Sequence, residues 1–316
     1  MKLLPLVAGL SACALVAQPL AAQTLGIGSN PQGSIAYSTA AAIAKVATEE
    51  GGIRTAVVPQ GGPVVTIPMV NNGELEFSVS VSLPAAYANR GVAMFKGRPQ
   101  PHLRVVAALF PLQVGFFVPE KSDIKSVAEL KGKRIPSGYN KQRVNGVMSD
   151  AVLAVSGLSE KDVRGVPVPD GVRGVQDLAD GNVDAGFFSI GSAKVTEAAT
   201  TIGGIRFLTL PDTPEAQAKM RKAAPGAFIG PVQPAPNKVG VTAGINAMTA
   251  PYLLLAGEKT PDDAVYKVVK AIYQNKAKLI AVMKDFDDFD PKKINADVGI
   301  PYHAGAIKFF KEAGLN

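Results

Sequence analysis

The sequence predicts an α/β fold made of two lobes, and three observations carry that prediction. Short strand patterns alternate with helical patterns along the chain, which is typical of a parallel sheet covered by helices. About 294 residues follow a candidate export signal, enough for two ordinary domains. Residues 73–80 and 181–189 share one plan, in which a helical pattern stops at a glycine, an acidic turn follows, and a strand ends at serine. This echo, 108 residues apart, suits two lobes built alike.

Local signals place the first elements in order. Ser34 and Pro63 are expected at helix starts, as an N-cap and a first helical residue. Pro68 falls inside the second helix and is expected to kink or shorten it. Late in the chain, Thr260 is expected to cap a helix that has Pro261 in its first position. The patterns predict strands at 24–28 and 53–58, helices at 34–47, from 63 and over 144–155, and a helix after 260.

The first 22 residues indicate export. A lysine, an apolar stretch and small residues ending at Ala22 are typical of a cleaved signal peptide, which predicts a periplasmic protein. Lipid attachment at Cys13 is the alternative, but the apolar run before it is short and residues 14–22 stay apolar. Cys13 is the only cysteine, so cleavage leaves no disulfide. No later stretch approaches the roughly 20 apolar residues of a membrane span, so any transport role needs membrane partners.

The charge balance argues against nucleic acid as a partner. The formal net charge is +7, but the basic residues are dispersed and no stripe interleaves them with aromatic residues. A mild attraction for small anions or for an acidic partner is expected instead, beside the plain alternative of a solvated basic surface.

The glycine-rich stretch at Gly26–Tyr37 first suggests a phosphate-binding loop. A dinucleotide fingerprint is excluded because Pro31 stands at the third glycine position, and no Gly-Lys-Ser/Thr makes a Walker loop. A strand-to-helix turn remains, with free backbone N–H groups and the positive end of a helix dipole. These suit a carboxylate as well as a phosphate. The same residues are equally typical of a plain turn and helix cap.

Residues for catalysis or metal binding are scarce. His102 and His303 are the only histidines, neither with a nearby second ligand, and His102 is expected in a surface loop. The stretch Asp285–Asp290 resembles a calcium loop only in composition, and is expected to form a solvated turn with two docked phenylalanines. No nucleophile elbow occurs. The sequence therefore predicts no metal, no cofactor and no enzymatic activity.

Several short motifs, in their order and spacing, resemble one family over nearly the whole chain after residue 22. The chain is similar to the TAXI-type solute-binding proteins of TRAP transporters. The motifs are Gly26-x-Gly28 with Gly33-Ser34 and Tyr37, then Gln60-Gly61-Gly62, Asn72–Phe77, Leu130–Arg134, Gly181–Phe188 and Ile300–Phe310.

The resemblance implies a two-lobed fold like that of type II periplasmic binding proteins, with two crossover segments and a ligand between the lobes. On that plan lobe I holds residues 23–114 and 245–316, and lobe II holds residues 115–244. It also implies that the ligand is a small organic acid or amino acid, handed to membrane subunits that use an ion gradient. The open alternatives are an ABC-type or sensor-linked binding protein for an amino acid or another small anion, and an exported enzyme.

Two departures from the family pattern shape the ligand hypothesis. Val81-Ser82-Leu83 replaces a stretch that commonly carries an acid, and Gln142-Arg143-Val144-Asn145 replaces a glycine- and serine-rich helix start. A cleft that loses an acid and gains an arginine favours a carboxylate without an amino group, bound by Arg143 and helix N–H groups. The alternative for Arg143 is a solvated surface position. The predicted ligand-binding residues are Ser29, Asn30, Gln32, Gly33, Ser34, Tyr37, Gly61, Gly62, Ser82, Tyr139, Arg143, Asn145, Phe188 and Ser189.

Overall fold

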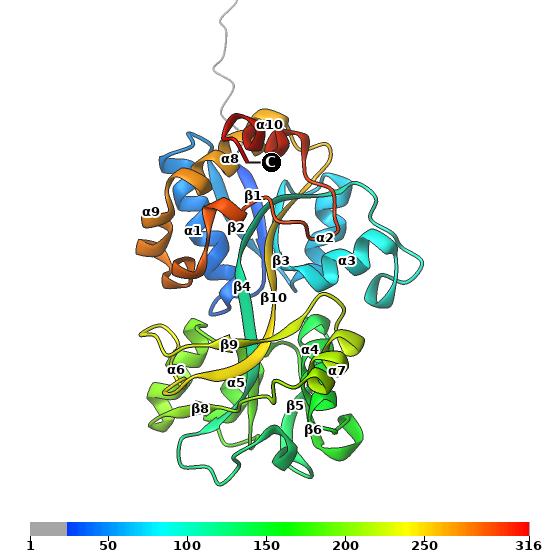
Figure 1. Cartoon of the computed structure of the whole chain (residues 1–316), viewed down its shortest axis with the longest axis vertical. Coiled ribbons are helices and arrows are strands. Elements are labelled where there is room, and N and C mark those ends of the chain that lie inside the picture. Colours follow the sequence, from blue (N-terminus) through cyan, green and yellow to red (C-terminus); the bar gives the residue numbers. More distant parts are fainter. Residues whose placement is uncertain (1–23, 316) are drawn as a thin grey trace, which may run out of the picture.

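The computed structural model describes residues 24–315 and shows two lobes, one above the other in Figure 1. The predicted signal peptide, its cleavage after Ala22 and the question of Cys13 lie outside the described residues. Among the described residues, no helix has the length and apolar character needed to cross a membrane.

Lobe I contains three parallel strands, β1 (Leu25–Ser29), β2 (Thr55–Pro59) and β3 (Phe77–Val81), in the order β2-β1-β3. They form one end of an eight-stranded sheet among the described residues. Helices follow these strands, as expected for βαβ units. They are α1 (Ile35–Glu49), α2 (Pro63–Asn72) and α3 (Ser82–Arg90), with α8 (Asp262–Gln274), α9 (Lys276–Val282) and α10 (Ala304–Glu312) added from the C-terminal part.

Two long strands run from one lobe into the other, as Figure 1 shows. These are β4 (Leu103–Pro119) and β10 (Ile245–Gly257), which pair antiparallel over most of their length, with register shifts near Pro251 and near Leu254. In lobe I, β10 lies beside β3. In lobe II the same two strands pair with β7 (Gly186–Ser189), β8 (Ile205–Phe207) and β9 (Phe228–Val232). The lobe limits at 114/115 and 244/245 stay a prediction.

The rest of lobe II packs around a separate pair of parallel strands, β5 (Arg134–Gly138) and β6 (Arg164–Val168). Its helices are α4 (Arg143–Val155), α5 (Gly171–Ala179), α6 (Ala193–Ile202) and α7 (Pro214–Ala223). Short 3-10 helices complete the chain at Ala93–Phe95 (η1), Val127–Leu130 (η2), Glu160–Asp162 (η3), Lys284–Asp288 (η4) and Pro291–Lys293 (η5).

The local signals of the sequence set most helix starts. Ser34 caps α1, its Oγ accepting the Tyr37 N–H at 3.2 Å, and Pro63 opens α2. The prediction that Thr260 caps α8 was wrong: the cap residue is Pro261, and the Thr260 hydroxyl instead donates to the Glu76 carbonyl oxygen at 3.2 Å. The expected shortening at Pro68 is also absent, since α2 runs on to Asn72.

Candidate functional site

A small, partly open cavity lies where residues of both lobes meet. Its volume is about 30 Å³, enough for about two water molecules or one carboxylate group. Lobe I contributes the end of β1, the first turns of α1 and α2, and the end of β3, and lobe II contributes the start of α4 and the end of β7. The lining residues are Asn30, Ser34, Ile35, Ala36, Pro63, Ser80, Val81, Leu112, Gln142, Val144, Asn145, Met148, Phe188, Ser189 and Tyr252.

The first turns of three helices, α1, α2 and α4, take part in this lining. N–H groups in a first turn have no acceptor inside their own helix. In α1 the Ser34 hydroxyl satisfies only Tyr37, and the N–H groups of Ile35 and Ala36 have no partner among the described residues. The same holds for Val144 in α4. The cavity therefore collects free donors and the positive ends of helix dipoles.

The cavity wall is polar without being charged. No Lys, Arg, His, Asp or Glu belongs to the described residues that line it. Its polar side chains are amides and hydroxyls, together with Tyr252, whose pKa is raised by burial so that it stays neutral. An anion held here would be neutralised by helix termini and hydrogen bonds alone.

Asn30 presents a buried amide oxygen that has no hydrogen-bond partner among the described residues. The side chain lies against Gly62, the N-cap of α2, which adopts φ +87°. A Cβ on Gly62 would stand 2.2 Å from Asn30 Oδ1, so only glycine fits both the backbone and the space. A buried polar atom left without a partner costs stability, and because this oxygen is an acceptor, a donor such as a water molecule satisfies it and a carboxylate does not.

On the lobe II side, Gln142 organises the wall. Its Oε1 accepts hydrogen bonds from the Asn145 side-chain amide at 3.2 Å and from the Gly171 N–H at 2.8 Å. Gly171 leaves no room for a side chain, because a Cβ would lie 2.2 Å from the Phe188 ring. The start of α5 thereby fixes the position of the start of α4.

The two lobes also bond to each other directly. The Gly33 carbonyl of lobe I accepts the Lys194 N–H of lobe II at 3.1 Å. On another side, the Lys238 ammonium of lobe II lies 2.9 Å from the Asp288 carboxylate of lobe I, with the lysine side chain only 11% exposed. The lobes are therefore closed on each other.

The structure brings several predicted site residues together at the cavity and leaves others at its margin. Asn30, Ser34, Asn145, Phe188 and Ser189 line it. Three others lie outside the lining. Ser29 is buried, and its hydroxyl donates to the Asn30 carbonyl. The Gly33 carbonyl bonds to lobe II, and Gly62 lies beside Asn30. Gln32 is exposed, Tyr37 is half-buried, and Ser82 is buried at the start of α3.

Arg143 and Tyr139 do not lie where they were expected. Arg143 is exposed and lines an open surface cavity of about 340 Å³, with Gly61, Val64, Val65, Asn140 and Lys141. It is the first residue of α4, and the roughly 100° turn per helical residue directs Val144 and Asn145 inward while Arg143 points to solvent. Tyr139 lines a different cavity inside lobe II.

Sequence reasoning missed Gln142, Ser80 and Tyr252 as cavity residues. Ser80 lies near the end of the buried strand β3, directly before residues 81–83, where the sequence departs from the family pattern. That position was a usable signal. Gln142 belongs to the other departure, at 142–145, which was also a signal. Tyr252 gave none, because its register opposite Val81 is a tertiary feature.

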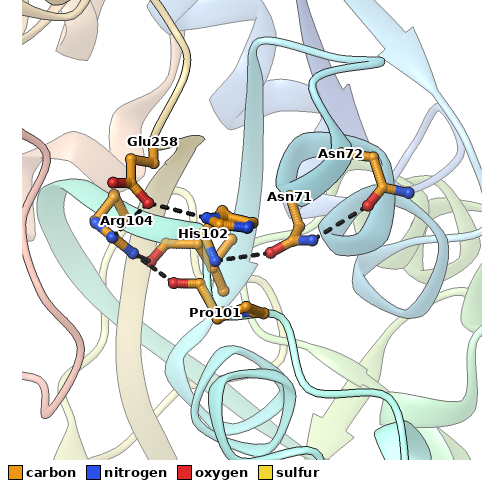
Figure 2. A network of polar contacts seen from close by, with 7 residues as sticks. Asn71, Asn72, Pro101, His102, Arg104 and Glu258 are labelled. Atoms are coloured by element: carbon orange, nitrogen blue, oxygen red, sulfur yellow. Dashed lines mark hydrogen bonds and ion pairs between the residues drawn. The ribbon is translucent and has the colours of Figure 1, made fainter.

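A second polar cluster, shown in Figure 2, lies outside the cavity. His102 Nδ1 and Arg104 Nη2 lie 3.0 and 2.7 Å from Glu258 Oε2, and the His102 N–H donates to Asn71 Oδ1. The His102 hydrogen bond and the Arg104 charge hold the pKa of Glu258 below its usual value. Asn71 stands about 12 Å along α2 from Pro63, which lines the cavity. This exposed cluster joins chain segments at the far end of lobe I, where His102 was expected on the surface.

Comparisons with known proteins identify the fold. A model of the NMT1-like family matches residues 27–314. MatC from Rhodopseudomonas palustris with bound malate aligns at 14% identity over 92% of this chain and 96% of that chain, with a TM-score of 0.59. PhnD1 from Prochlorococcus marinus in complex with methylphosphonate aligns at 12% identity over 92% and 97%, with a TM-score of 0.54. These likenesses show the α/β fold of type II periplasmic binding proteins.

Proposed function

This chain belongs to the NMT1-like family, and we propose that it is an extracytoplasmic solute-binding protein that captures a small organic anion between its lobes. The observation that carries the proposal is the convergence of the first turns of α1 and α4, with their free N–H groups, on one largely buried cavity that Pro63 of α2 also lines. Free N–H groups and helix dipoles bind anions without a charged side chain. Enclosure strengthens each of these interactions because it excludes water.

The uncharged wall narrows the ligand class to acids without an amino group. An amino acid would need an acceptor for its ammonium group, and no carboxylate belongs to the described cavity lining. An unpaired buried ammonium is costly. The room of about 30 Å³ suits the carboxylate itself, so the rest of a longer acid extends out of this cavity toward the gap between the lobes.

The exposed cations at the rim have a different task in this proposal. Lys141 and Arg143 line the open surface cavity together with Gly61 and Val65 of lobe I. Charges in this position attract an anion toward the gap between the lobes, and salt screens that attraction. Arg143 thus contributes to the rate at which the anion is captured. It does not pair with the bound carboxylate, as the sequence suggested.

Delivery to TRAP-type membrane subunits rests on the resemblance of the sequence motifs to TAXI-type proteins. An ABC-type partner is the alternative, which differs in its energy source. Uptake of the labelled ligand by cells that make this protein distinguishes the two. Uptake that stops when ionophores collapse the ion gradients, while ATP is maintained, supports the TRAP assignment, and uptake that follows ATP alone contradicts it.

A thermal-shift screen of organic anions, using protein unfolded and refolded to remove carried ligand, tests the binding proposal. A true ligand at 100 times its Kd adds about 2.7 kcal/mol to the free energy of unfolding. The panel holds mono- and dicarboxylates, 2-oxo and 2-hydroxy acids, methylphosphonate and methanesulfonate. Stabilisation by a carboxylate supports the proposal, and stabilisation by none of these anions contradicts it.

Two variants in the same loop locate the binding site for the acid that the screen selects. Asn30→Asp places a negative charge in the cavity wall and is expected to weaken binding by about a hundredfold or more, because like charges at close range repel strongly when buried. Gln32→Glu makes the same change in charge on an exposed side chain and is expected to change affinity less than about threefold. Equal losses in calorimetric titrations of both variants would place the anion elsewhere.

A further inference from the structure

Gln142 is a buried amide in the wall of the cavity between the lobes, and its side chain is only 3% exposed. It directly precedes α4 of lobe II. It also faces lobe I, because a Cβ on Gly62 would lie 3.8 Å from Gln142 Cγ. An amide carries an acceptor at one end and two N–H donors at the other. Which end faces the cavity therefore decides what this part of the wall can bind.

The neighbouring backbone fixes the orientation of the Gln142 amide. The Gly171 N–H, which can only donate, lies 2.8 Å from Gln142 Oε1, and the Asn145 amide nitrogen lies 3.2 Å from the same oxygen. An amide turned the other way would set its NH₂ group against the Gly171 N–H, so that two donors would meet. The oxygen is therefore directed into lobe II, and Nε2 lies at the opposite side of the amide.

The Nε2 group of Gln142 is left free. No acceptor among the described residues pairs with it. The fully buried side-chain atoms that lack a partner belong to Asn30, Ser82, Tyr139 and His303, and Nε2 of Gln142 is not one of them. This nitrogen thus keeps accessible surface. Because Gln142 lines the cavity and is covered on nearly every other side, the free N–H groups point into the cavity.

We propose that Gln142 is the residue of lobe II that holds the carboxylate of the ligand and sets the preference of the site for an anion. This inference rests on the proposed function. Nε2 donates to the carboxylate together with the free N–H group of Val144. Gly171 and Asn145 occupy both lone pairs of Oε1, so Gln142 has no acceptor left for an ammonium group.

Formate, formamide and formamidinium test this role, because they share one small planar shape and are negative, neutral and positive. Formate is a bare carboxylate, which suits a cavity of about 30 Å³. The NMR signals of the Gln142 side-chain NH₂ group, in the refolded chain free of ligand, are expected to shift saturably with formate, weakly with formamide and not with formamidinium. Signals that do not respond to formate would overturn the inference.

The same titration separates this inference from the anion proposal. Formate that shifts the backbone signals at the starts of α1 and α4, but not the Gln142 side chain, would overturn the role of Gln142 and leave the proposed function standing. The thermal-shift screen of anions judges the proposed function by itself.

Gln142→Glu reverses the charge preference if Nε2 holds the anion. The variant keeps an oxygen for Gly171 and Asn145, but it places a carboxylate where Nε2 stands. At pH 8 it is expected to bind formate about a hundredfold more weakly or worse, and to bind formamidinium. Gln233→Glu makes the same change on an exposed side chain of lobe II and is expected to leave both affinities unchanged.

The pH dependence of Gln142→Glu distinguishes a direct contact from a structural role. Burial raises the pKa of a carboxyl group, so at pH 5 the new glutamate is expected to be protonated, to donate as the amide does, and to recover formate binding. The wild-type affinity should not follow pH in this range, because no described lining residue titrates there. A wild-type preference for formate in Gln142→Glu at pH 8, or a loss that pH 5 does not reverse, contradicts the assignment. The wild-type spectra decide on their own where the variant does not fold.

Discussion

Asp285 shows at the scale of one residue how the closed lobes alter side-chain chemistry. It was expected in a solvated turn, yet it is buried, and its carboxylate lies so close to Gly191 of lobe II that a Cβ there would stand 2.5 Å from Oδ1. Burial raises the pKa of Asp285 to about 6. The two phenylalanines of the turn, Phe286 and Phe289, are buried as expected.

The raised pKa of Asp285 sets the sign of a pH effect on stability. In the folded chain the Asp285 carboxyl keeps its proton up to about pH 6, whereas in the unfolded chain it loses the proton near pH 4. The free energy of unfolding therefore falls as the pH rises between these values. Asp285→Asn is expected to raise stability by about 2 kcal/mol at pH 8, as one pKa unit equals about 1.4 kcal/mol, and to change it little at pH 4. Urea unfolding at both pH values measures this, with Asp123→Asn as control. A loss of stability at pH 8 would refute it.

Individual site residues were predictable only where a local rule applied. Asn30 and Ser34 follow from a strand that ends in a polar turn before a helix. Arg143 was misplaced because a family pattern gives the chain position of a helix start but not the direction of each side chain around it. Tyr139 was named as a ligand residue for the cleft, and the structure places it in the wall of the lobe II cavity.

At the scale of elements, helix starts were predictable because caps and prolines act within a few residues. The shared plan of residues 73–80 and 181–189 is of this kind: Gly73 and Gly181 both adopt positive φ just after a helix, and the strands β3 and β7 follow. The pairing of β4 with β10 joins residues about 140 positions apart and has no local signal. The resemblance alone implied that two segments cross.

The short helix η4 and the segment between β9 and β10 form a latch between the lobes, through Lys238 and Asp288. Lys238→Ala is expected to favour the open form and weaken anion binding about fivefold, since a partly buried ion pair contributes on the order of 1 kcal/mol. Asp288→Ala should have the same effect, and the double variant should add little more. Small-angle scattering and calorimetry measure opening and affinity. Unchanged affinity in both single variants would show that the latch does not hold the lobes closed.

At the scale of the whole molecule, two lobes joined by two continuous strands enclose a site that neither lobe contains alone. Each lobe supplies helix starts, and closure brings them to one small cavity. The two-lobed α/β architecture was predictable from the alternation of elements and the length of the chain. The degree of closure was not, because it depends on contacts such as Gly33 with Lys194 and Lys238 with Asp288.

The most direct test of the central claim compares carboxylates with their amino-acid counterparts by calorimetry on the mature, ligand-free protein. The pairs are pyruvate with alanine, 2-oxoglutarate with glutamate, and malate with aspartate. The uncharged cavity wall predicts that the acid of at least one pair binds at least about a hundredfold more tightly than its amino counterpart, since an unpaired ammonium costs several kcal/mol in an enclosed site. Tighter binding of the amino acids would contradict the claim.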